Sequence, residues 1–436
     1  MYIKTLYQYY KDCGGQITTD SRNCPKGSLF IALKGENFDG NLYASKALEN
    51  GAAFVIVDNP EVVIEGDDRY ILVHDSLHAL QQMANYHRQM LKTPIIAITG
   101  TNGKTTTKEL IANVLLKKYK THYTQGNLNN HIGVPLTILS MTASDEMAVI
   151  EMGANHPGEI KDLTRIVLPD YGLITNVGKA HLEGFGSLEG VIRTKSELYD
   201  YLKEKKNGTA FINFDDSILM KQAEGISHLI TYGTSESASV CGKIDDSSLT
   251  LSLEWYKTTL SNNIQRINTQ LIGDYNLSNI LAAITIGVFF KVPIEDIKEA
   301  LEQYTPQNNR SQFKKTESNQ LIIDAYNANP TSMLAALNNF CNLKAEHKMV
   351  ILGDMRELGK DSLLEHQKII DFLTKHKDIE KVLLVGDEFC KTNHPYTHFN
   401  DVNEVKDYLV SDPITDHTIL IKGSNGIRLF TLVDSF

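Results

Sequence analysis

A glycine-rich run with one lysine and several threonines is the strongest chemical signal in the sequence. It reads Gly100-Thr101-Asn102-Gly103-Lys104-Thr105-Thr106-Thr107 and follows the apolar residues 95–99. The apolar run predicts a buried strand, and apolar residues on helical spacing predict a helix over residues 105–118. Backbone N–H groups between a strand and a helix start form a cradle for anions. We therefore expect a nucleotide-phosphate site, called the phosphate loop below, at Gly100, Thr101, Asn102, Gly103, Lys104, Thr105 and Thr106.

Two side chains of this loop carry the expected chemistry. Lys104 can reach the β- and γ-phosphates of a nucleotide, and the Thr105 hydroxyl can ligate Mg²⁺. The usual G-x-x-x-x-G-K-[ST] pattern has its first glycine where this chain has Ile98, so the loop is a shortened G-x-x-G-K-T variant. The alternative is an ordinary strand-to-helix turn, but residue types and context together favour the phosphate site.

Two further polar side chains follow apolar runs that predict parallel strands. Glu151 ends the run 147–151, and His181 comes shortly after the run 172–176. The carboxyl ends of parallel strands lie at the edge of a sheet where ligands bind. Glu151 could therefore complete the Mg²⁺ shell begun by Thr105, or it could be a solvated strand end. His181 could be a functional group at the same edge or a structural histidine.

Other polar residues leave functional and structural interpretations open. Lys195 lies in a helical stretch, where its chemistry alone predicts a solvated lysine. Asn276 and Asn279 lie one turn apart at the start of a helix, so their amides could read an adenine edge or cap the helix. Arg310 follows a Pro-Gln-Asn-Asn loop. Asp324 ends a strand, where either a ribose-binding carboxylate or a simple turn residue would stand.

Strands that alternate with helices must position these residues, and this alternation predicts an α/β fold. We expect three domains: residues 1–92, a central P-loop-type parallel-sheet ATPase domain at residues 93–305, and a smaller Rossmann-like C-terminal α/β domain at residues 306–436. Polar and apolar residues alternate over residues 233–269, which predicts an antiparallel insertion. Helices are also expected at 76–90 and 276–290, and further strands at 28–33, 53–57, 70–73, 209–213, 320–324, 348–352, 381–385 and 418–421.

Composition and charge exclude several classes of protein. Apolar residues make up 42% of the 436 residues and charged residues 22%, which is typical of a globular chain and not of a disordered or fibrous one. The net charge of -10 predicts no nucleic-acid or membrane-surface partner. The five scattered cysteines contain no C-x-x-C pair and predict neither disulfides nor a zinc site. With no signal-peptide core and no apolar span, we expect a cytoplasmic enzyme without a membrane span.

Together these motifs resemble the Mur ligases, the ATP-dependent enzymes that build the peptide of bacterial peptidoglycan. The chain carries TGTNGKTTT, GNLNNHIGVP, EMG, NVGKAHLE, the helix with Asn276 and Asn279, and DAYNANP in the order and spacing of that family. The resemblance covers essentially the whole chain, and the motifs are jointly highly specific. It implies that the three domains bind the uridine nucleotide, bind ATP, and complete the ligase site, in chain order.

The resemblance also implies roles for individual residues. It implies catalytic roles for Lys104, Lys195 and His181, with Lys104 on the transferring phosphoryl group. Lys195 matches the lysine that is carbamylated in the family, which would overturn its interpretation as a solvated residue. Two Mg²⁺ ions would be held by Thr105, Glu151, His181 and the carbamylated Lys195. ATP would contact the phosphate loop and Asn276, Asn279, Arg310 and Asp324. The uridine nucleotide would contact Ser21, Arg22, Lys34, Phe38, Asp39 and Gly40.

Three segments resemble the branch of the family that joins D-alanyl-D-alanine to UDP-N-acetylmuramoyl-tripeptide. They are LKGENFDG at residues 33–40, DAYNANPTSM at residues 324–333 and ILGDMRELG at residues 351–359. The branch that adds lysine or diaminopimelate typically carries a D-N/D-P-R motif in its third domain. The Asp-Asn-Pro of this chain instead begins at Asp58, in the first domain, and is followed by Glu61.

Two positions depart from the family pattern. Asn41 stands where a histidine is usual after FDG, and Asn425 stands where the K-G-S-R motif has its arginine. Arg428 follows three residues after Asn425 and is a candidate anchor for the carboxylate of the dipeptide.

The resemblance implies amide formation through an acyl phosphate, in the cytoplasmic synthesis of peptidoglycan precursors. ATP would phosphorylate the terminal carboxylate of the tripeptide, and the amine of D-Ala-D-Ala would displace phosphate, giving UDP-MurNAc-pentapeptide and ADP. We expect a monomer that acts on these small molecules. The alternatives are a Mur-type ligase that adds lysine or diaminopimelate, a folylpolyglutamate synthase, a P-loop ATPase without ligase activity, and a non-catalytic nucleotide-binding regulator.

Overall fold

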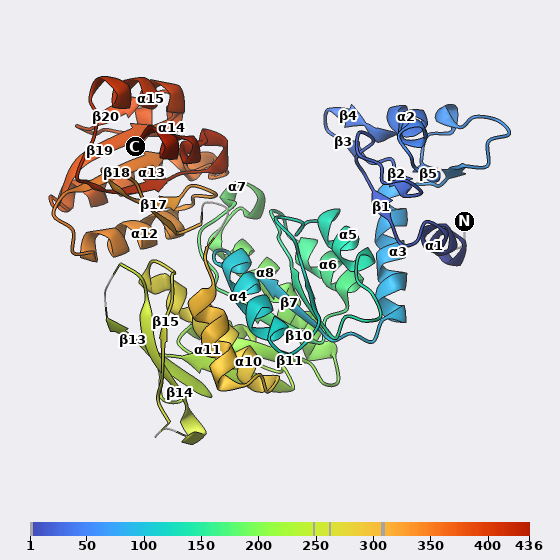
Figure 1. Cartoon of the computed structure of the whole chain (residues 1–436), viewed down its shortest axis with the longest axis horizontal. Coiled ribbons are helices and arrows are strands. Elements are labelled where there is room, and N and C mark those ends of the chain that lie inside the picture. The colour runs from blue at the N-terminus through green and yellow to red at the C-terminus, as the bar shows by residue number, and fades with distance from the viewer. Residues whose placement is uncertain (1–2, 247–248, 261–262, 307–309) are drawn as a thin grey trace. The chain divides into compact units, whose positions relative to one another are not determined.

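A computed structural model describes residues 3–246, 249–260, 263–306 and 310–436, and over these ranges the chain is an α/β protein (Figure 1). This confirms the predicted fold class. Within the described ranges, no helix is both long enough and apolar enough to cross a membrane.

The chain forms two compact units. The first comprises Met1–Ile98, Tyr119–Ala154 and Gly158–Gly172, and the second comprises Thr99–Lys118, Asn155–Pro157 and Leu173–Phe436. These units do not follow the expected boundaries after residues 92 and 305, so the three-domain division stays a prediction. Each unit is described in turn.

The N-terminal part of the first unit is built on a four-stranded parallel sheet with the order β1-β2-β5-β6. A buried cluster that includes Phe30, Val55 and Tyr70 packs the sheet against helix α2. The elements are α1 (Ile3–Asp12), β1 (Ile17–Thr18), β2 (Leu29–Ile31), β3 (Lys34–Gly35), β4 (Phe38–Asp39), η1 (Gly40–Tyr43), α2 (Ala44–Glu49), β5 (Phe54–Val57), η2 (Pro60–Val62), β6 (Tyr70–Leu72) and α3 (Ser76–Met90).

The remainder of the first unit contains three parallel strands in the order β7-β9-β8. Every residue of β7 and β9 is buried, as expected for parallel strands covered on both faces. The elements are β7 (Ile95–Thr99), β8 (Thr121–Tyr123), α5 (Gly133–Leu139), β9 (Met147–Glu151) and α6 (Glu159–Val167).

The second unit begins at Thr99, so it contains the phosphate loop and the helix after it, and it continues through strands in the order β15-β14-β13-β12-β11-β10. Strands β13, β14 and β15 pair antiparallel, which confirms the predicted insertion. The elements are α4 (Lys104–Leu116), β10 (Tyr171–Ile174), α7 (Leu182–Phe185), α8 (Leu188–Glu204), β11 (Thr209–Asn213), α9 (Ser217–Gln222), β12 (His228–Gly233), β13 (Val240–Asp246), β14 (Ser252–Lys257), η3 (Thr258–Leu260), β15 (Gln265–Asn268), η4 (Asp274–Asn276), α10 (Leu277–Phe289) and α11 (Ile294–Gln303).

The C-terminal part of the second unit is a six-stranded sheet with the order β16-β17-β21-β18-β19-β20, in which only β16 runs antiparallel to its neighbour. Its elements are β16 (Gln312–Lys315), β17 (Gln320–Asp324), α12 (Pro330–Asn342), β18 (Lys348–Gly353), η5 (Gly359–Asp361), α13 (Ser362–Lys375), β19 (Ile379–Val385), α14 (Asp387–Cys390), β20 (Thr397–Phe399), α15 (Val402–Ser411), β21 (Thr418–Lys422), η6 (Asn425–Ile427) and η7 (Leu429–Ser435).

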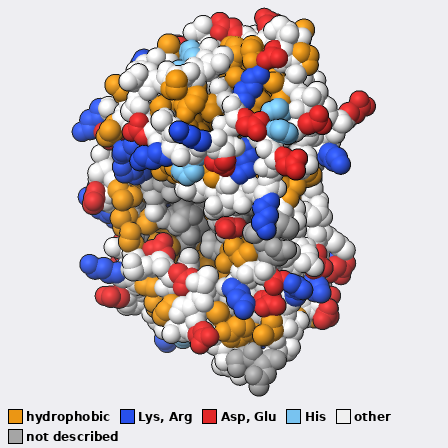
Figure 2. Space-filling view, turned by 90° about the vertical axis from the view of Figure 1, so that its left-hand side faces the viewer, with side chains coloured by type: hydrophobic (Ala, Val, Ile, Leu, Met, Phe, Trp, Pro, Cys, Tyr) orange, Lys and Arg blue, Asp and Glu red, His pale blue; other side chains and the backbone are white. Residues whose placement is uncertain are grey.

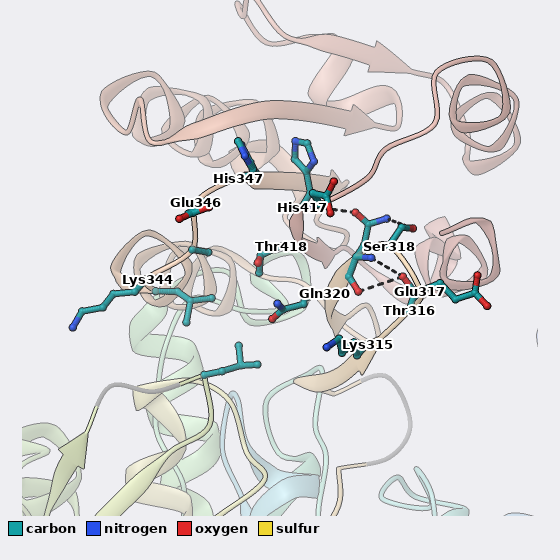
Figure 3. A pocket seen from close by; sticks show the side chains of 15 residues that line it. Lys315, Thr316, Glu317, Ser318, Gln320, Lys344, Glu346, His347, His417 and Thr418 are labelled. Carbon is teal, nitrogen blue, oxygen red and sulfur yellow. Dashed lines mark hydrogen bonds between the residues drawn. The ribbon is translucent and has the colours of Figure 1, made fainter.

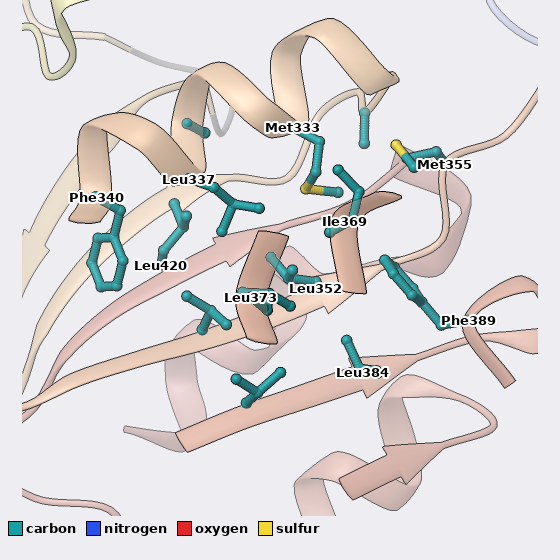
Figure 4. Close-up of a cluster of buried hydrophobic side chains, with 14 of the residues drawn as sticks. Met333, Leu337, Phe340, Leu352, Met355, Ile369, Leu373, Leu384, Phe389 and Leu420 are labelled. Atoms are coloured by element: carbon teal, nitrogen blue, oxygen red, sulfur yellow. The ribbon is translucent and has the colours of Figure 1, made fainter. Parts of the chain in front are cut away.

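Alternate residues of this C-terminal sheet face two separate cores. On one face, Leu352, Leu384 and Leu420 pack with Met333 and Ile369 of helices α12 and α13 (Figure 4). The opposite face packs against α15 and the C-terminal turns. This alternation covers both faces of the sheet and leaves its strand ends open, which is where ligands bind in such folds.

The surface carries both signs of charge. Figure 2 shows lysine and arginine side chains interspersed with aspartate and glutamate over one face of the molecule. Several ion pairs join neighbouring surface residues, including Lys46–Glu49 and Lys203–Asp200, each with its N and O atoms 2.9–3.0 Å apart.

Candidate active site

The phosphate loop has the geometry that the sequence predicts. It leaves the buried strand β7, turns through Gly100 and Gly103, and enters α4 at Lys104. Gly100 has φ +143° and Gly103 has φ +78°, conformations that L-residues rarely adopt. A Cβ on Gly100 would lie 2.1 Å from the Thr175 hydroxyl, and a Cβ on Gly103 would lie 2.8 Å from the Asn279 amide oxygen. Both positions therefore require glycine.

Hydrogen bonds from two chain segments fix the loop. The Asn102 N–H donates to the Asn176 side-chain oxygen at 3.0 Å, and the Asn176 amide returns a bond to the Asn102 carbonyl at 3.0 Å. The Thr101 hydroxyl accepts from Gly178 N–H at 3.0 Å. The Asn329 amide donates to the Asn102 side-chain oxygen at 2.7 Å, which brings DAYNANP to the loop. The loop is therefore preorganised by its neighbours rather than by its own sequence alone.

The two chemically active side chains of the loop lie at the start of α4. The Lys104 ammonium donates to the carbonyls of Gly100 at 2.7 Å and Thr101 at 3.0 Å, so it folds back over the turn. Thr105 is buried in the first turn of the helix. A helix N-terminus and a lysine at one turn form a preorganised anion site.

Asn276 and Asn279 form a buried relay rather than a helix cap. The Asn276 amide donates to the Ile272 carbonyl at 2.8 Å, and the Asn279 amide donates to the Asn276 side-chain oxygen at 2.8 Å. The Asn279 oxygen accepts from the Thr107 hydroxyl at 3.0 Å. The Asn276 side chain makes no capping bond at the start of α10. The relay therefore connects α10 to the first turn of α4, directly after the phosphate loop.

His181 and Lys195 approach the same aromatic ring in the second unit. The His181 ring lies edge-on to Phe185 with centroids 6.3 Å apart, and the Lys195 ammonium lies 5.2 Å from the centroid of that ring. Lys195 is only 2% exposed, so its interpretation as a solvated helix lysine is wrong. His181 Nδ1 also pairs with Oε2 of Glu357, and this bond holds the pKa of Glu357 below its usual range.

The burial of Lys195 could have been found in the sequence. It follows Val191 by four residues and precedes Leu198 by three, and both are buried residues of α8. It therefore stands on the apolar stripe of the helix, where a lysine is rare unless it is paired or modified.

In the first unit, Glu151 ends β9 and is only 1% exposed. Its backbone N–H donates to the Thr124 hydroxyl at 2.9 Å, and its Oε1 accepts from the Asn129 amide at 2.8 Å. Asn129 belongs to the GNLNNHIGVP segment. The interpretation of Glu151 as a solvated strand end is therefore wrong, since a buried carboxylate needs a partner.

Asp324 and Arg310 lie at the carboxyl end of β17 and in the chain before β16. The Asp324 carboxylate pairs with Lys422 at 2.5 Å, and Lys422 is almost fully buried at the end of β21. The Arg310 guanidinium carbon lies 3.7 Å from the centroid of the Tyr326 ring. Burial, together with the nearby Asp324 charge, raises the pKa of Tyr275, whose hydroxyl contacts Ser311 at 2.7 Å.

Five of the six predicted uridine-nucleotide residues are exposed or half-buried in the first unit, and the sixth, Gly40, is buried. Arg22 pairs with Asp20 through two bonds of 2.9 Å, and Ser21 lies between them. Lys34 of β3 pairs with Asp58 at 2.9 Å, and the Phe38 side chain is 59% exposed at the start of β4. A lysine and an exposed aromatic ring on one hairpin could bind the phosphates and the base of a nucleotide.

Asn41, which departs from the family pattern, is a buried support for that hairpin. Its amide donates to Asp39 at 2.7 Å and to Asp58 at 2.8 Å, and its oxygen accepts from the Asp58 N–H at 3.0 Å. Gly40 precedes it, and a Cβ there would lie 2.5 Å from the Leu33 carbonyl oxygen. Hydrogen bonds therefore fix the Asn41 side chain. Asn41 in turn orients Asp58, the carboxylate that pairs with Lys34.

A cavity of about 410 Å³ lies at the carboxyl ends of the C-terminal strands. Three cations line it: Arg356 after β18, Lys406 on α15 and Arg428 after β21. A Cβ on Gly426 would lie 2.5 Å from a guanidinium nitrogen of Arg356, so glycine lets that guanidinium lie against the backbone. Asn425 is not among the lining residues, whereas Arg428 is.

A larger cavity of about 900 Å³ lies at the opposite edge of the same sheet (Figure 3). It is lined by Gln320 and Thr418, which begin β17 and β21, and by His347 before β18. None of the predicted site residues lines it. In parallel α/β sheets ligands bind at the carboxyl ends of strands, so this cavity is not the candidate active site.

The sequence interpretation did not single out three side chains that complete the site. Glu357 pairs with His181, Lys422 pairs with Asp324, and Glu365 accepts from Lys179 of NVGKAHLE at 2.8 Å. All three pairs are long-range contacts, and no local pattern predicts them.

A phosphate loop between a buried parallel strand and a helix is typical of α/β proteins that bind nucleotides. The chain matches the Mur ligase family, catalytic domain, at residues 15–88, the Mur ligase middle domain at residues 98–287, and the Mur ligase, glutamate ligase domain, at residues 309–425. The chain belongs to the Mur ligase family.

Several similar proteins match nearly the whole chain. The UDP-N-acetylmuramoyl-tripeptide--D-alanyl-D-alanine ligase of Bacillus subtilis is 35% identical over 442 residues, which cover 98% of this chain and 94% of that protein. A crystal structure of MurF from Acinetobacter baumannii has a TM-score of 0.86 and 30% identity, covering 98% of this chain and 97% of that one. A MurF ligase from Thermotoga maritima in complex with ADP has a TM-score of 0.85 and 26% identity, covering 97% and 96%.

Proposed function

We propose that this chain joins D-alanyl-D-alanine to UDP-N-acetylmuramoyl-tripeptide with ATP, in the cytoplasmic synthesis of peptidoglycan precursors. The observation that carries the proposal is the bond from Asn329 of DAYNANPTSM to Asn102 of the phosphate loop. It joins a segment typical of the D-Ala-D-Ala branch to the nucleotide site. The full-length similarity to ligases of that name supports the same substrates.

The phosphate loop would hold ATP, with its backbone N–H groups and the N-terminus of α4 facing the phosphates. Lys104 would leave the carbonyls it contacts and follow the phosphoryl group as it moves to the tripeptide carboxylate. The product of this step is an acyl phosphate and ADP. Attack by the dipeptide amine then releases phosphate and forms the amide, so the residues serve mainly to position reactants and neutralise charge.

The donor set fits Mg²⁺ only if Lys195 is carbamylated. Mg²⁺ prefers oxygen ligands, and Thr105 and Glu151 supply a hydroxyl and a carboxylate. Among the described residues, no group of three or more His, Cys, Asp and Glu side chains could hold a metal. A carbamate on the buried Lys195 would add the missing oxygens, with His181 as a further ligand. When bound, two Mg²⁺ ions supply positive charge beside the phosphates.

The remaining residue roles follow the family pattern. We propose that Asn276, Asn279, Arg310 and Asp324 belong to the ATP site, the first two through the relay that connects α10 to the first turn of α4. The uridine nucleotide would bind the first domain at Ser21, Arg22, Lys34, Phe38, Asp39 and Gly40. We propose that the domains at residues 1–92, 93–305 and 306–436 bind the uridine nucleotide, bind ATP and complete the ligase site, in that order, and that the protein is a monomer.

Arg428 is our candidate for the anchor of the dipeptide carboxylate. It lines the 410 Å³ cavity with Arg356, and two guanidinium groups suit a carboxylate. Arg356 is followed directly by Glu357, which contacts the candidate metal ligand His181. A carboxylate anchored here would therefore lie near the reacting phosphoryl group.

The experiment is ADP release measured over a matrix of nucleotide-peptide acceptors and amine donors. Turnover should require both the muramoyl-tripeptide and D-Ala-D-Ala. It should be slow with lysine, diaminopimelate or L-Ala-L-Ala. Faster turnover with lysine or diaminopimelate would assign the chain to the other branch. ADP release without any amine would favour an ATPase.

A further inference from the structure

We propose that His366 is a positioning residue for Arg356: it holds the turn after β18 so that this arginine meets the dipeptide carboxylate, and it does so only while its imidazole is neutral. The inference rests on the proposed function, in which Arg356 and Arg428 bind that carboxylate. His366 lies on helix α13, outside the motifs that the sequence analysis singled out.

The two ring nitrogens of His366 make hydrogen bonds of opposite kinds. The Met355 N–H can only donate, and it lies 3.0 Å from Nε2, so Nε2 is the acceptor. The Ser362 carbonyl can only accept, and it lies 2.8 Å from Nδ1, so Nδ1 carries the proton. The side chain is fully buried, which shields both bonds from solvent. These two partners together require a neutral ring.

The turn after β18 is attached to its surroundings at three successive residues. The Asp354 carbonyl accepts from the Ser424 N–H at 3.2 Å, and the Arg356 N–H donates to the Ser424 hydroxyl at 3.0 Å. Between them, Met355 donates to the histidine and buries its side chain in the core that contains Phe389 (Figure 4). The histidine therefore supplies the middle attachment of the turn.

These attachments decide where the Arg356 guanidinium lies. The side chain lines the 410 Å³ cavity together with Arg428 and Lys406. A Cβ on Gly426 would lie 2.5 Å from one guanidinium nitrogen of Arg356, so the group sits tightly against the chain after β21. Recognition of a carboxylate by two parallel N–H bonds depends on the placement of the guanidinium. A change in the course of the turn would therefore weaken dipeptide binding.

Burial is the largest influence on the ring and lowers the pKa of His366 below its ordinary value of about 6.5. The Ser362 carbonyl and the carboxylates of Asp354 and Glu388 act in the opposite direction. The Lys391 ammonium, just after α14, adds to the lowering. The neutral ring is therefore the stable form at neutral pH.

Protonation of His366 would break the bond to Met355. With a proton on both nitrogens, Nε2 becomes a donor that faces the Met355 N–H, and Asp354 Oδ1, 3.9 Å away, is an acceptor that it can approach. The bond is present above the lowered pKa and is lost as the pH falls through it, below about 6.5. The turn should loosen in that range, and the KM for the dipeptide should rise.

Three variants separate this bond from other roles of the histidine. His366→Ala removes the acceptor of the Met355 N–H. His366→Gln carries an amide oxygen that can accept from it and that does not titrate. His376→Gln is the matched control, because His376 lies at the end of the same helix and its Nδ1 also contacts the carbonyl four residues back, that of Phe372, at 2.8 Å.

The first measurement is the steady-state kinetics of the full-length enzyme at about pH 8, where the neutral ring predominates. His366→Ala should raise the KM for D-Ala-D-Ala about 10-fold or more, as expected for a weakened charge-assisted contact. It should leave kcat and the KM values for ATP and the tripeptide unchanged, because only binding of the dipeptide is affected. His366→Gln and His376→Gln should resemble wild type. A fall in kcat with an unchanged dipeptide KM would overturn the proposal.

The second measurement needs no substrate. Amide exchange of residues 353–359 is followed by mass spectrometry in the full-length protein from about pH 8 to about pH 4.5, corrected for the intrinsic effect of pH on exchange. Wild type and His376→Gln should lose protection of this segment as the pH falls, whereas His366→Gln should keep it. Wild type and His366→Gln that lose protection alike would overturn the proposal.

The exchange series also decides the matter if His366→Ala does not fold, since it compares wild type with the glutamine variants. Failure of D-Ala-D-Ala as a substrate would reject the proposed function. The exchange series would then still decide whether His366 holds the turn.

Discussion

Replacing Lys104 with alanine tests the phosphate site directly. In the structure the Lys104 ammonium donates to two backbone carbonyls, those of Gly100 and Thr101. Loss of two such bonds at a partly exposed site costs about 1–3 kcal/mol in the free energy of unfolding. A domain with about 5–15 kcal/mol of stability stays folded after that loss. Turnover should instead fall on the order of 10³-fold, or about 4 kcal/mol of transition-state stabilisation.

Lys118 supplies the matched control for this variant. It lies just beyond the other end of α4, and its ammonium also donates to two backbone carbonyls, those of Phe290 at 3.2 Å and Lys291 at 2.8 Å. Lys118→Ala should therefore lose a similar amount of stability and keep its turnover. The contrast separates loss of hydrogen bonds from loss of a charge on the phosphoryl group.

The assay is ADP release with saturating D-Ala-D-Ala and muramoyl-tripeptide, paired with denaturant unfolding of each variant. Near-normal turnover in Lys104→Ala would refute the phosphate-loop interpretation. An equal fall in both variants would show that the loss arises from stability.

Three further predictions follow from named contacts. Gly103→Ala should lose more stability than Gly14→Ala. Both residues have positive φ, so both variants share a backbone strain of roughly 1–2 kcal/mol, but only a Cβ on Gly103 would clash with a neighbouring side chain. Denaturant unfolding of the two variants measures the difference. Lys195→Ala should be nearly inactive and partly restored by formate or acetate, whereas a free amine at Lys195, seen by mass spectrometry in active enzyme, would contradict the carbamate. Burial opposes ionisation of Glu365, but hydrogen bonds from Lys179 and a second lysine outweigh it and hold its pKa below the usual value. Its stabilisation is thus present above about pH 4.3 and lost as pH falls through the lowered pKa, so the unfolding free energy of wild type should fall more steeply there than that of Glu365→Gln.

Strong local patterns predicted much of the fold. The buried run Ile95–Thr99 and the helix Ser76–Met90 have the bounds that the sequence predicted, because an apolar run and a helical stripe are both local signals. Strand β12 (His228–Gly233) was missed, since its first residues are exposed and its pattern is interrupted by polar residues. The three-residue strands β8 and β20 were missed because they lie at sheet edges and are too short for a pattern.

The site was predictable where a motif carries its own chemistry. The phosphate loop needs glycine at two positions and a lysine at the helix start, and those demands are visible in one short stretch. The residues that support the loop could not be identified from the sequence, since the bond from Asn329 to Asn102 joins residues far apart in the chain. The sequence showed Asn41 only as a departure from a pattern, and its buried contacts with Asp39 and Asp58 explain why an amide suits that position.

The burial of polar groups links these observations. Lys195, Glu151 and Lys422 are each at most 2% exposed, and charged groups are rarely buried unless a partner compensates their desolvation. For Lys422 the partner is Asp324 within the protein, so the pair is complete without a ligand. Glu151 accepts a hydrogen bond from the Asn129 amide, and the Lys195 ammonium lies over the Phe185 ring, so these two buried charges also have neighbours within the protein. Under the proposed function, Lys195 and Glu151 would keep their charges out of water, and a charge in a dry environment acts more strongly on a transferring phosphoryl group.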